Sequence, residues 1–422
     1  MENKLILITN PGSSSRKYAL YKGNEEICSL HFEYEGKDVI CTLKKADGKK
    51  KVLKQEFKEL TSTVANINRI LTEEGVLGGM TKIDAILARV ACPGEFFTQD
   101  HVVDEAYLKA LDKAKKRAPL HVPVVAAEIE HLVKSFKGTP VIAISDSSFH
   151  ADRPDLMKYY AFDTELADKA DVKRFGYHGL SVGAIVQYMK KQDILPQKLI
   201  VCHLGSGSSI TAVFEGKSLD TTMGYSPLEG LMMATRCGNI DPAAALAIKH
   251  YLKFESDEGI EKYLNKECGL KGVSGQTDDM REILRLRDEG DKRGTFAHAM
   301  YVYKVQSLIG QMAASLGGVD AIVFTATIGE RSDEIRRTVS QKLNYLGFAI
   351  DEKKNVSDMP ERHTNIAAEG SKPVWVIRTD ESEEMIRRAG AILDTDNDGE
   401  VSKNELDEAA KKNRTANVAK KK

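Results

Sequence analysis

The sequence predicts an α/β protein built from two similar lobes with a cleft between them. Segments with strand character alternate with segments of helical periodicity along the chain, which is typical of α/β layers. A β-rich stretch at 5–23 recurs at 198–216, so that Gly12 falls on Gly205. At ~150 residues per domain, the 422 residues are enough for two or three domains. We therefore expect two such units, joined near residue 147.

The first half of the chain is expected to form a hairpin at 5–23, followed by helices and strands in alternation. Each copy of the repeat consists of two β-rich runs, a Gly/Ser turn and a closing glycine, which is the pattern of a β-hairpin with a small polar tip. The other elements of this half are helices at 57–72, 107–115 and 124–136 and strands at 83–92 and 140–145.

The second half is expected to repeat this scheme around the hairpin at 198–216. Its helices are expected at 179–191, 242–253, 280–286, 295–316 and 332–345, and its strands at 321–325 and 374–378, before a last helix. We therefore expect an N-terminal lobe at 1–147, joined by a returning helix at about 382–393, a C-terminal lobe at 148–381, and a tail at 394–422.

Composition and charge exclude several classes of protein. Hydrophobic residues make up 42% of the chain and charged residues 29%, which excludes collagen-like, low-complexity and wholly disordered proteins. The 61 Lys and Arg residues balance 62 Asp and Glu residues, so no overall positive field attracts nucleic acid or an anionic membrane. We expect neither partner.

The cysteines and the N-terminus favour a cytoplasmic protein. None of the six cysteines has CxxC spacing, which disfavours zinc and thioredoxin-like sites and is consistent with reduced thiols. The apolar run at 5–8 is too short for a signal peptide. No stretch approaches the ~18 apolar residues that are needed to span a bilayer.

The two hairpin tips favour phosphate binding. Glycine and serine bring backbone N–H groups and hydroxyls together without side-chain bulk, so such a tip can approach phosphate oxygens. Neither NPGSSSRK nor LGSGSSIT ends in the GK[ST] of a P-loop. Two ordinary hairpins in a duplicated fold are the alternative. Two tips at matching positions suggest that phosphate is held from both sides of a cleft.

Ten ordered motifs give the chain a resemblance to the acetate kinase family of short-chain acyl kinases, over residues 5–388. The motifs are NPGSSSRKY, ARVACPGE, APLHVP, SDSSFH, GYHG, HLGSGSS, DTTMGYSPLEGLMMATRCGNIDP, SGQTDDMRE, VFTATIGE and VIRTDE. The resemblance implies two ribonuclease-H-like lobes of the actin, hexokinase and Hsp70 superfamily. It also implies reversible phosphoryl transfer from ATP to a small carboxylate such as acetate, a need for Mg²⁺, and a homodimer.

The resemblance also implies a set of site residues. Phosphoryl transfer depends on positioning and on stabilising charge on the equatorial oxygens, a task that guanidinium forks suit. The implied catalytic residues are Arg89, Arg236, His178 and Asp146. Glu381 would hold Mg²⁺, and the phosphate- or metal-proximal residues would be Asn10, Ser13, Ser15 and Lys17. The implied nucleotide-binding residues are His203, Gly205, Ser206, Gly207, Ser208, Asp279, Met280, Arg281, Thr327, Ile328, Gly329 and Glu330.

The implied pocket for the acyl group consists of Ala91, Leu120, Tyr177 and Pro227. Acetate-preferring relatives usually carry Val at the position of Ala91, so the pocket here is expected to be larger. Because a methylene fitted into such space is worth only ~1–3 kcal/mol, we expect propionate to be used comparably to acetate. Tyr177 replaces the usual Phe, and its hydroxyl is expected to cancel part of this gain.

Several positions depart from the family pattern. Cys92 and Pro93 replace a His and a Gly, Ser206 and Asn239 replace an Asn and an Asp, and Thr327 and Arg331 replace a Gly and an Asn. If the Gly at position 327 required φ > 0, a β-branched residue would be strained there. Arg331 could add a phosphate contact. These changes concern nucleotide affinity, and they leave the implied catalytic residues in place.

The tail carries a second motif, which the family resemblance does not supply. DTDNDGEVSKNE at 394–405 satisfies the EF-hand pattern D-x-D-x-D-G-x₅-E. The candidate Ca²⁺ ligands are Asp394, Asp396, Asp398, Glu400 and Glu405. An acidic helix end in a charged tail is the alternative interpretation.

Two other functions compete with a short-chain acyl kinase. One is a kinase for a carbohydrate or another carboxylate on the same fold, which the small apolar pocket disfavours. The other is a catalytically weakened, calcium-responsive nucleotide-binding protein, which intact Arg89, Arg236 and His178 disfavour.

Overall fold

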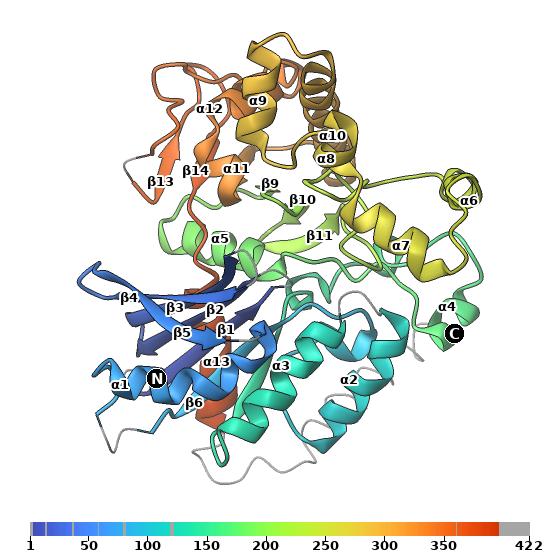
Figure 1. The fold of residues 1–422 in the computed structure, drawn as a ribbon. Helices are drawn as coiled ribbons and strands as arrows, with labels where there is room; N and C mark the ends of the chain where they lie inside the picture. The colour runs from blue at the N-terminus through green and yellow to red at the C-terminus, as the bar shows by residue number, and fades with distance from the viewer. Residues whose placement is uncertain are drawn as a thin grey trace, which may run out of the picture.

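The computed structural model describes residues 3–12, 15–35, 38–57, 59–78, 82–118, 122–359 and 361–395 (Figure 1). It consists of two β-sheets, one from each half of the chain, with helices packed on their faces. Figure 1 shows the N-terminal half below and the C-terminal half above. The expected α/β fold of two lobes is confirmed.

The N-terminal sheet has the strand order β5-β4-β3-β2-β1-β6-β8-β7. Its expected hairpin is β1–β2, and β1 continues the sheet by pairing parallel to β6. The strands are β1 (Leu5–Pro11), β2 (Ser15–Lys22), β3 (Glu25–Glu35), β4 (Asp38–Lys45), β5 (Lys50–Phe57), β6 (Ala85–Val90), β7 (His101–Val102) and β8 (Val141–Ser145). Helices α1 (Ile67–Glu73), α2 (Glu105–Arg117) and α3 (Val122–Ser135) belong to the same half.

The C-terminal sheet has the order β11-β10-β9-β12-β14-β13 and repeats the scheme of the first. Here β9 pairs antiparallel to β10 and parallel to β12, as β1 does with β2 and β6. The strands are β9 (Lys198–Leu204), β10 (Ser208–Phe214), β11 (Lys217–Thr221), β12 (Ala321–Thr325), β13 (His363–Asn365) and β14 (Val374–Ile377). The predicted repeat is thus a repeat of sheet topology.

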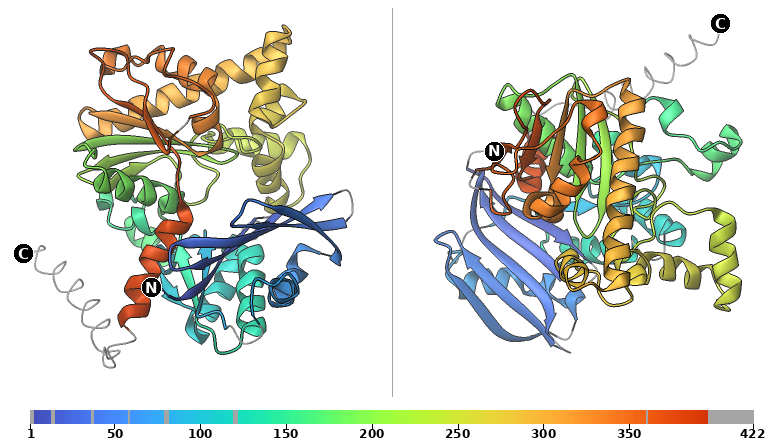
Figure 2. Two further views of the ribbon diagram at one scale, coloured as in Figure 1. Left: turned by 90° about the vertical axis from the view of Figure 1, so that its left-hand side faces the viewer. Right: turned by 90° about the horizontal axis from the view of Figure 1, so that it is seen from above.

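The helices of this half complete the lobe and lead back to the first sheet. They are α4 (Thr164–Ala170), α5 (Gly179–Lys191), α6 (Pro242–Tyr251), α7 (Asp257–Lys266), α8 (Gly269–Ser274), α9 (Met280–Asp288), α10 (Lys292–Leu316), α11 (Ala326–Arg331), α12 (Asp333–Ser340) and α13 (Glu381–Thr395). Helix α13 leaves the C-terminal sheet and lies along the N-terminal one (Figure 2, left). There Met385, Ile386 and Ala389 join Ile6 and Leu87 in one core cluster.

The central parallel strands form the core of each lobe. All five residues of β8 and of β12 are buried, as expected for strands covered by helices on both faces. Helix α5 packs against one face of the C-terminal sheet and α10 against the other. No helix among the described residues is both long and apolar enough to cross a membrane.

The helix expected at 57–72 is wrong over its first half. Phe57 ends β5, and two short 3₁₀ turns precede α1, which begins only at Ile67. The hydroxyls of Ser62 and Thr63 donate to the carbonyls three residues earlier, at 2.7 Å each. Such side-chain bonds compete with the helical ladder. The helix expected at 332–345 is likewise shorter, because α12 ends at Ser340 and a 3₁₀ turn follows at Asn344–Leu346.

A buried ion pair ties the first hairpin to α3. Arg16 Nε lies 3.3 Å from Glu128 Oε2, and the two side chains are 3% and 1% exposed. The other Glu128 oxygen accepts from the Thr9 hydroxyl at 2.9 Å, and Arg16 also donates to the carbonyl of Gly12. Burial raises the pKa of Glu128, and the Arg16 charge opposes this rise. Strands β1 and β2 are thus anchored to helix α3.

We predict that Glu128→Leu lowers the free energy of unfolding by about 3–5 kcal/mol, because it leaves the Arg16 charge buried without its partner. The double variant Arg16→Met/Glu128→Leu should recover most of this loss, since it removes both charges. Urea unfolding of the three proteins measures the effect. A double variant as unstable as the single one would contradict the prediction.

Candidate active site

The site begins where three strands of the N-terminal sheet end side by side. Arg89 lies at the end of β6 and Asp146 directly follows the parallel strand β8. The guanidinium donates to both carboxylate oxygens of Asp146, at 2.9 Å from Nη2 and 3.3 Å from Nε. A third donor, Nη1, lies 3.3 Å from Oδ1 of Asn10 at the end of β1. The strand order therefore fixes the orientation of this arginine.

Asp146 also binds the start of helix α5. Its carboxylate accepts from the backbone N–H of His178 at 2.9 Å, and its carbonyl accepts from Gly179 N–H at 2.7 Å. A Cβ at Gly179 would lie only 2.4 Å from that carbonyl, so this close approach requires glycine. Burial alone would raise the pKa of Asp146, but the Arg89 charge and these hydrogen bonds hold it below its usual value. Asp146 is therefore ionised at neutral pH.

His178 and His203 form a stacked, partly buried pair. Their ring centroids lie 4.0 Å apart at an interplanar angle of 23°. His178 Nδ1 lies 3.0 Å from the Ser209 hydroxyl, and His203 Nδ1 lies 2.8 Å from the Ser181 hydroxyl. Burial lowers the pKa of His203 to about 4. Burial, with the charges of the neighbouring arginines, also lowers the pKa of His178 well below its usual value, so both rings are neutral at pH 7.

The second hairpin tip, residues 205–208, meets Arg236 and His178. A Cβ at Gly207 would lie 3.2 Å from Arg236 Nη1 and 3.3 Å from His178 Nε2, so both groups lie close to this tip. Burial lowers the pKa of Arg236, and the positive charge of Arg89 lowers it further. The structure thus brings Arg89, Arg236 and His178 together, with Asp146 behind them.

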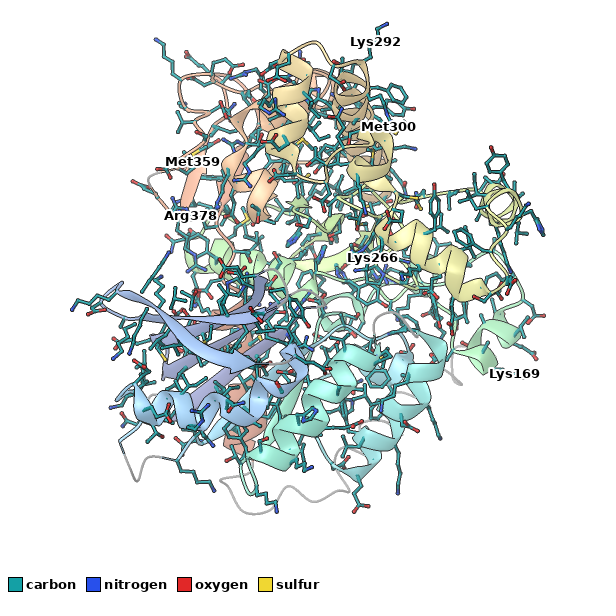
Figure 3. The ribbon with its side chains drawn as sticks, viewed as in Figure 1. Lys169, Lys266, Lys292, Met300, Met359 and Arg378 are labelled. Carbon is teal, nitrogen blue, oxygen red and sulfur yellow. The ribbon has the colours of Figure 1, made fainter. Side chains whose placement is uncertain are left out.

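Arg236 has no acidic partner among the described residues. Its Nη1 lies 3.4 Å from the Pro227 carbonyl and 3.5 Å from the Met233 sulfur. Lys266 of α7, labelled in Figure 3, is close enough to Arg236 to be repelled by its positive charge. Burial lowers the pKa of Lys266, and the Arg236 charge lowers it further. No sequence motif indicated a role for this lysine. The region therefore carries an excess of positive charge that favours an anion.

Beside Arg236 lies a small apolar cluster. Tyr177, Met223 and Met233 are buried together, and Ala91 packs against them. Both methionines lie within the long motif at 220–242 but were not predicted as pocket residues. The Tyr177 hydroxyl donates to the Tyr225 carbonyl at 2.7 Å. The hydroxyl is thus directed at the backbone of Tyr225, and the expectation that it cancels part of the gain in pocket size stays a prediction. Leu120 lies outside the described residues.

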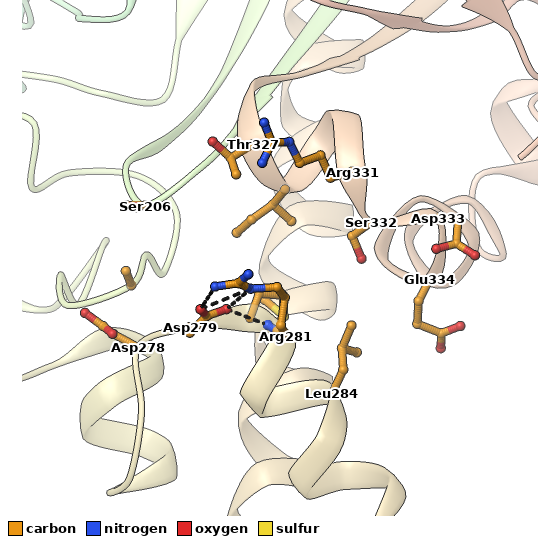
Figure 4. Close-up of a pocket in the computed structure, with 13 residues that line it drawn as sticks. Ser206, Asp278, Asp279, Arg281, Leu284, Thr327, Arg331, Ser332, Asp333 and Glu334 are labelled. Carbon is orange, nitrogen blue, oxygen red and sulfur yellow. Dashed lines mark hydrogen bonds and ion pairs between the residues drawn. The ribbon is translucent and has the colours of Figure 1, made fainter. Parts of the chain in front are cut away.

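A pocket of about 580 Å³ lies between α9 and α11 in the C-terminal lobe (Figure 4). Its apolar walls are Met280, Leu284 and Ile328, and Arg281 lines it while forming an ion pair with Asp279 at the start of α9. Six of the expected nucleotide-binding residues line it: Ser206, Asp279, Met280, Arg281, Thr327 and Ile328. Its other residues, several of them at the start of α12, are Ala234, Asp278, Leu284, Arg331, Ser332, Asp333 and Glu334.

The remaining expected nucleotide-binding residues lie elsewhere. His203, Gly205, Gly207 and Ser208 belong to the second hairpin, toward the two arginines. The Glu330 carboxylate accepts from the N–H groups of Ala326 at 2.9 Å and Thr379 at 3.4 Å, so it joins α11 to the segment before α13. The carbonyl of Gly329 accepts from the buried Arg336 at 2.8 Å. These two residues therefore hold the pocket wall in place from behind.

The expected backbone strain lies one residue earlier than the sequence suggested. Thr327 does not adopt a positive φ, whereas Ala326 does, at 65°. A β-branched side chain at 327 is therefore compatible with the backbone, and the strain falls on a residue with the smallest Cβ substituent.

The acidic and first-tip residues fit a magnesium ion held together with a nucleotide. Glu381 is the first residue of α13. Burial raises the pKa of its carboxyl group, and the positive charge of Arg89 opposes this rise. Asp146 and Lys17 are also close enough to shift this pKa. Lys17 is exposed and pairs across the hairpin with Asn10. Within the described ranges, no three His, Cys, Asp or Glu side chains lie in a geometry that could hold a metal ion by themselves. Mg²⁺ typically takes one or two carboxylates plus phosphates and waters, so this donor set is sufficient.

Not every predicted residue can be placed. Ser15 begins β2, next to the turn, but Ser13 lies outside the described residues. Asp394 lies in the last turn of α13, and Asp396, Asp398, Glu400 and Glu405 lie beyond the described part of the tail. The six cysteines are all described, and none forms a disulfide.

Comparisons with known proteins agree with the geometry. A sequence model of the acetokinase family matches residues 5–388. An acetate kinase of Clostridium botulinum is 38% identical over 391 residues, which cover 91% of this chain and 98% of the relative.

Solved structures show the same likeness. The crystal structure of an acetate kinase from Porphyromonas gingivalis has a TM-score of 0.81 at 31% identity, and a propionate kinase from Francisella tularensis has 0.83 at 32%. The match to the acetate kinase covers 92% of this chain, and the match to the propionate kinase covers 91%. Each match covers 98% of the other protein's chain. The expected class of enzyme, a kinase that transfers phosphate to a carboxylate, is confirmed, and the chain belongs to the acetokinase family.

Proposed function

We propose that this enzyme transfers the γ-phosphoryl group of ATP reversibly to acetate and to propionate, with ADP as the other product. The observation that carries the proposal is the meeting of two guanidinium groups and a neutral imidazole beside a small apolar cluster. A carboxylate with a short alkyl chain matches this combination, because its charge meets the arginines and its methyl group meets Ala91, Met223 and Met233.

The chemical step is a direct in-line displacement. A carboxylate oxygen forms a bond to the γ-phosphorus while the bond from that phosphorus to the bridging oxygen of ADP breaks, and no proton is transferred. Arg89, oriented by Asp146, and Arg236 stabilise the charge on the equatorial oxygens. Because Arg236 has no acidic partner among the described residues, the reacting anion becomes its counter-charge.

His178 acts as a neutral hydrogen-bond donor in this account. With Nδ1 accepting from the Ser209 hydroxyl, its Nε2–H donates toward the space beside Gly207 and Arg236. The low pKa keeps this tautomer uncharged, so it adds no further repulsion to the arginine pair.

The nucleotide is proposed to bind with its adenosine in the pocket between α9 and α11. Met280 and Ile328 provide apolar surface for the base, and Arg331 lines the same pocket. Glu381 would hold Mg²⁺, with Asn10 and Asp146 nearby, and the ion when bound neutralises phosphate charge and helps to fix the phosphates. The apolar cluster disfavours a carbohydrate, whose hydroxyls need polar partners.

We predict that the protein forms ADP from ATP with acetate and with propionate, at kcat/KM values within tenfold of one another. Arg236→Ala should lower kcat by about 10³-fold or more, as expected when a guanidinium stabilises a transferring phosphoryl group. A coupled ADP assay measures both. Arg285→Ala, which removes an exposed arginine that pairs with Glu282 and Glu289, is the matched control. Arg236→Ala with activity within tenfold of the unsubstituted enzyme would contradict the mechanism.

We also propose that the protein is a homodimer that uses the outer face of α6. None of the residues of this helix is buried, although the segment PAAALAIKHY is mostly apolar. Leu246 is 56% exposed and Tyr251 81% exposed. Figure 1 shows α6 at the edge of the molecule, away from both sheets. An exposed apolar helix face of this kind favours a second copy packed against it.

Replacing both exposed side chains, Leu246→Glu and Tyr251→Glu, should convert the dimer into a monomer, because the charges prevent burial of this face. Sedimentation equilibrium measures the mass. Val52→Glu, at a 57% exposed position on β5, should leave it unchanged. A monomeric unsubstituted protein, or a dimer that survives both substitutions, would refute the proposed interface.

A cytoplasmic setting is part of the proposal. It is supported by six cysteines that form no disulfide.

We propose in addition that the tail segment 394–405 binds Ca²⁺ through its EF-hand pattern. The segment begins in the last turn of α13, whose first residue is Glu381, so calcium binding would stabilise the helix that carries the proposed Mg²⁺ ligand. Ca²⁺ at about a hundredfold its Kd should stabilise the folded protein by about 2.7 kcal/mol.

Thermal unfolding of the full chain with and without Ca²⁺, at fixed Mg²⁺, measures this effect. The melting temperature should rise for the unsubstituted protein and stay constant for Glu405→Gln. If Ca²⁺ changes neither the melting temperature nor the activity of the unsubstituted protein, the tail has no calcium site.

A further inference from the structure

The segment Tyr225–Glu229, which we call the acyl loop, lies against Tyr177 of the apolar cluster and against Arg236. On its inner side, Tyr177 donates from its hydroxyl to the Tyr225 carbonyl at 2.7 Å, and two residues later the Pro227 carbonyl lies 3.4 Å from Nη1 of Arg236. The same stretch of backbone therefore contacts both the cluster and the guanidinium that we assign to the reacting anion.

The outer side of the acyl loop is held by a second tyrosine. The Tyr160 hydroxyl accepts from Tyr225 N–H at 2.9 Å and donates to the Glu229 carboxylate, which also pairs with Arg174. A Cβ at Gly224 would lie 2.4 Å from the Tyr160 oxygen, so the loop approaches this network closely. The backbone of Tyr225 is therefore bound on both of its polar groups, by one tyrosine from each side.

The Tyr177 hydroxyl is the only polar group among the members of the apolar cluster. Tyr177 is 1% exposed, its ring packs with Met223 and Met233, and its hydroxyl reaches the loop backbone. A Phe at this position would make the same ring contacts and leave the Tyr225 carbonyl without this partner. The Tyr177 hydroxyl therefore helps to fix the position of the acyl loop, and the Tyr177 ring provides apolar surface.

We propose that the Tyr177 hydroxyl is a positioning group that sets acid chain length, by holding the acyl loop against the apolar cluster. The inference rests on the proposed function, because it assumes that the alkyl group of the acid lies against Tyr177 and Pro227. With the hydroxyl present, the loop limits the space beside Ala91 to a short chain. Without it, the loop can move outward, and longer chains gain space.

The test compares Tyr177→Phe with the unsubstituted enzyme on acetate, propionate and butyrate at saturating ATP. The ratio of kcat/KM for propionate to that for acetate should rise by about threefold to tenfold, and the butyrate ratio should rise at least as much. These changes in the kcat/KM ratio are smaller than the roughly 10- to 200-fold discrimination that one well-fitted methylene can produce. The effect should lie mainly in KM for the acid, because Arg89, Arg236 and His178 are unchanged.

Two further variants make the result specific. Tyr160→Phe, which releases the loop from its outer side, should shift the ratios in the same direction. Tyr188→Phe removes a tyrosine hydroxyl that bonds His363 at 2.6 Å, away from the cluster, and should leave them unchanged.

Ratios within twofold of the unsubstituted enzyme for both Tyr177→Phe and Tyr160→Phe would overturn the inference and leave the kinase assignment intact. An unsubstituted enzyme that phosphorylates none of the three acids would instead refute the proposed function.

Discussion

The repulsion between Arg89 and Arg236 is the interaction around which the site is organised. Each guanidinium lies within range of the other's charge, and only Arg89 has an acidic partner in the described part of the chain. Two partly buried like charges are unfavourable unless the surrounding structure holds them or an anion lies between them. Here Asp146 holds one arginine, and the second hairpin tip lies against the other. In the proposed reaction, a bound carboxylate or phosphoryl group would offset the repulsion that remains.

The duplicated fold explains how so many charged groups reach one place. In the first sheet the ends of β1, β6 and β8 bring together Asn10, Arg89 and Asp146. In the second, the tip between β9 and β10 reaches the same point from the other half of the chain. Helix α5 links them, because its first residues bond Asp146 while its body packs on the second sheet. A movement of one lobe against the other would therefore change the distance between the two arginines.

The sequence predicted those features that depend on local pattern or on motif. Both hairpins and their Gly/Ser tips were found, and the structure brings the predicted arginines and His178 together. Strands β3, β4 and β5 were not named, although alternating apolar residues such as Cys28, Leu30 and Phe32 are visible in the sequence. The start of α1 was placed too early because hydroxyl-to-carbonyl bonds override apolar spacing. Neither the direction of the Tyr177 hydroxyl nor the positive φ of Ala326 could be predicted, since both depend on tertiary contacts.

We propose that Arg89 and Arg236 share one anion, and a double-mutant cycle on ligand binding is the sharpest test of this sharing. The affinity of acetyl phosphate is measured by calorimetry for the unsubstituted protein, Arg89→Ala, Arg236→Ala and the double variant. Because both cations act on the same ligand and repel each other in its absence, the account predicts a coupling free energy of about 0.5–3 kcal/mol. Losses that simply add, or an affinity that neither substitution changes, would contradict it.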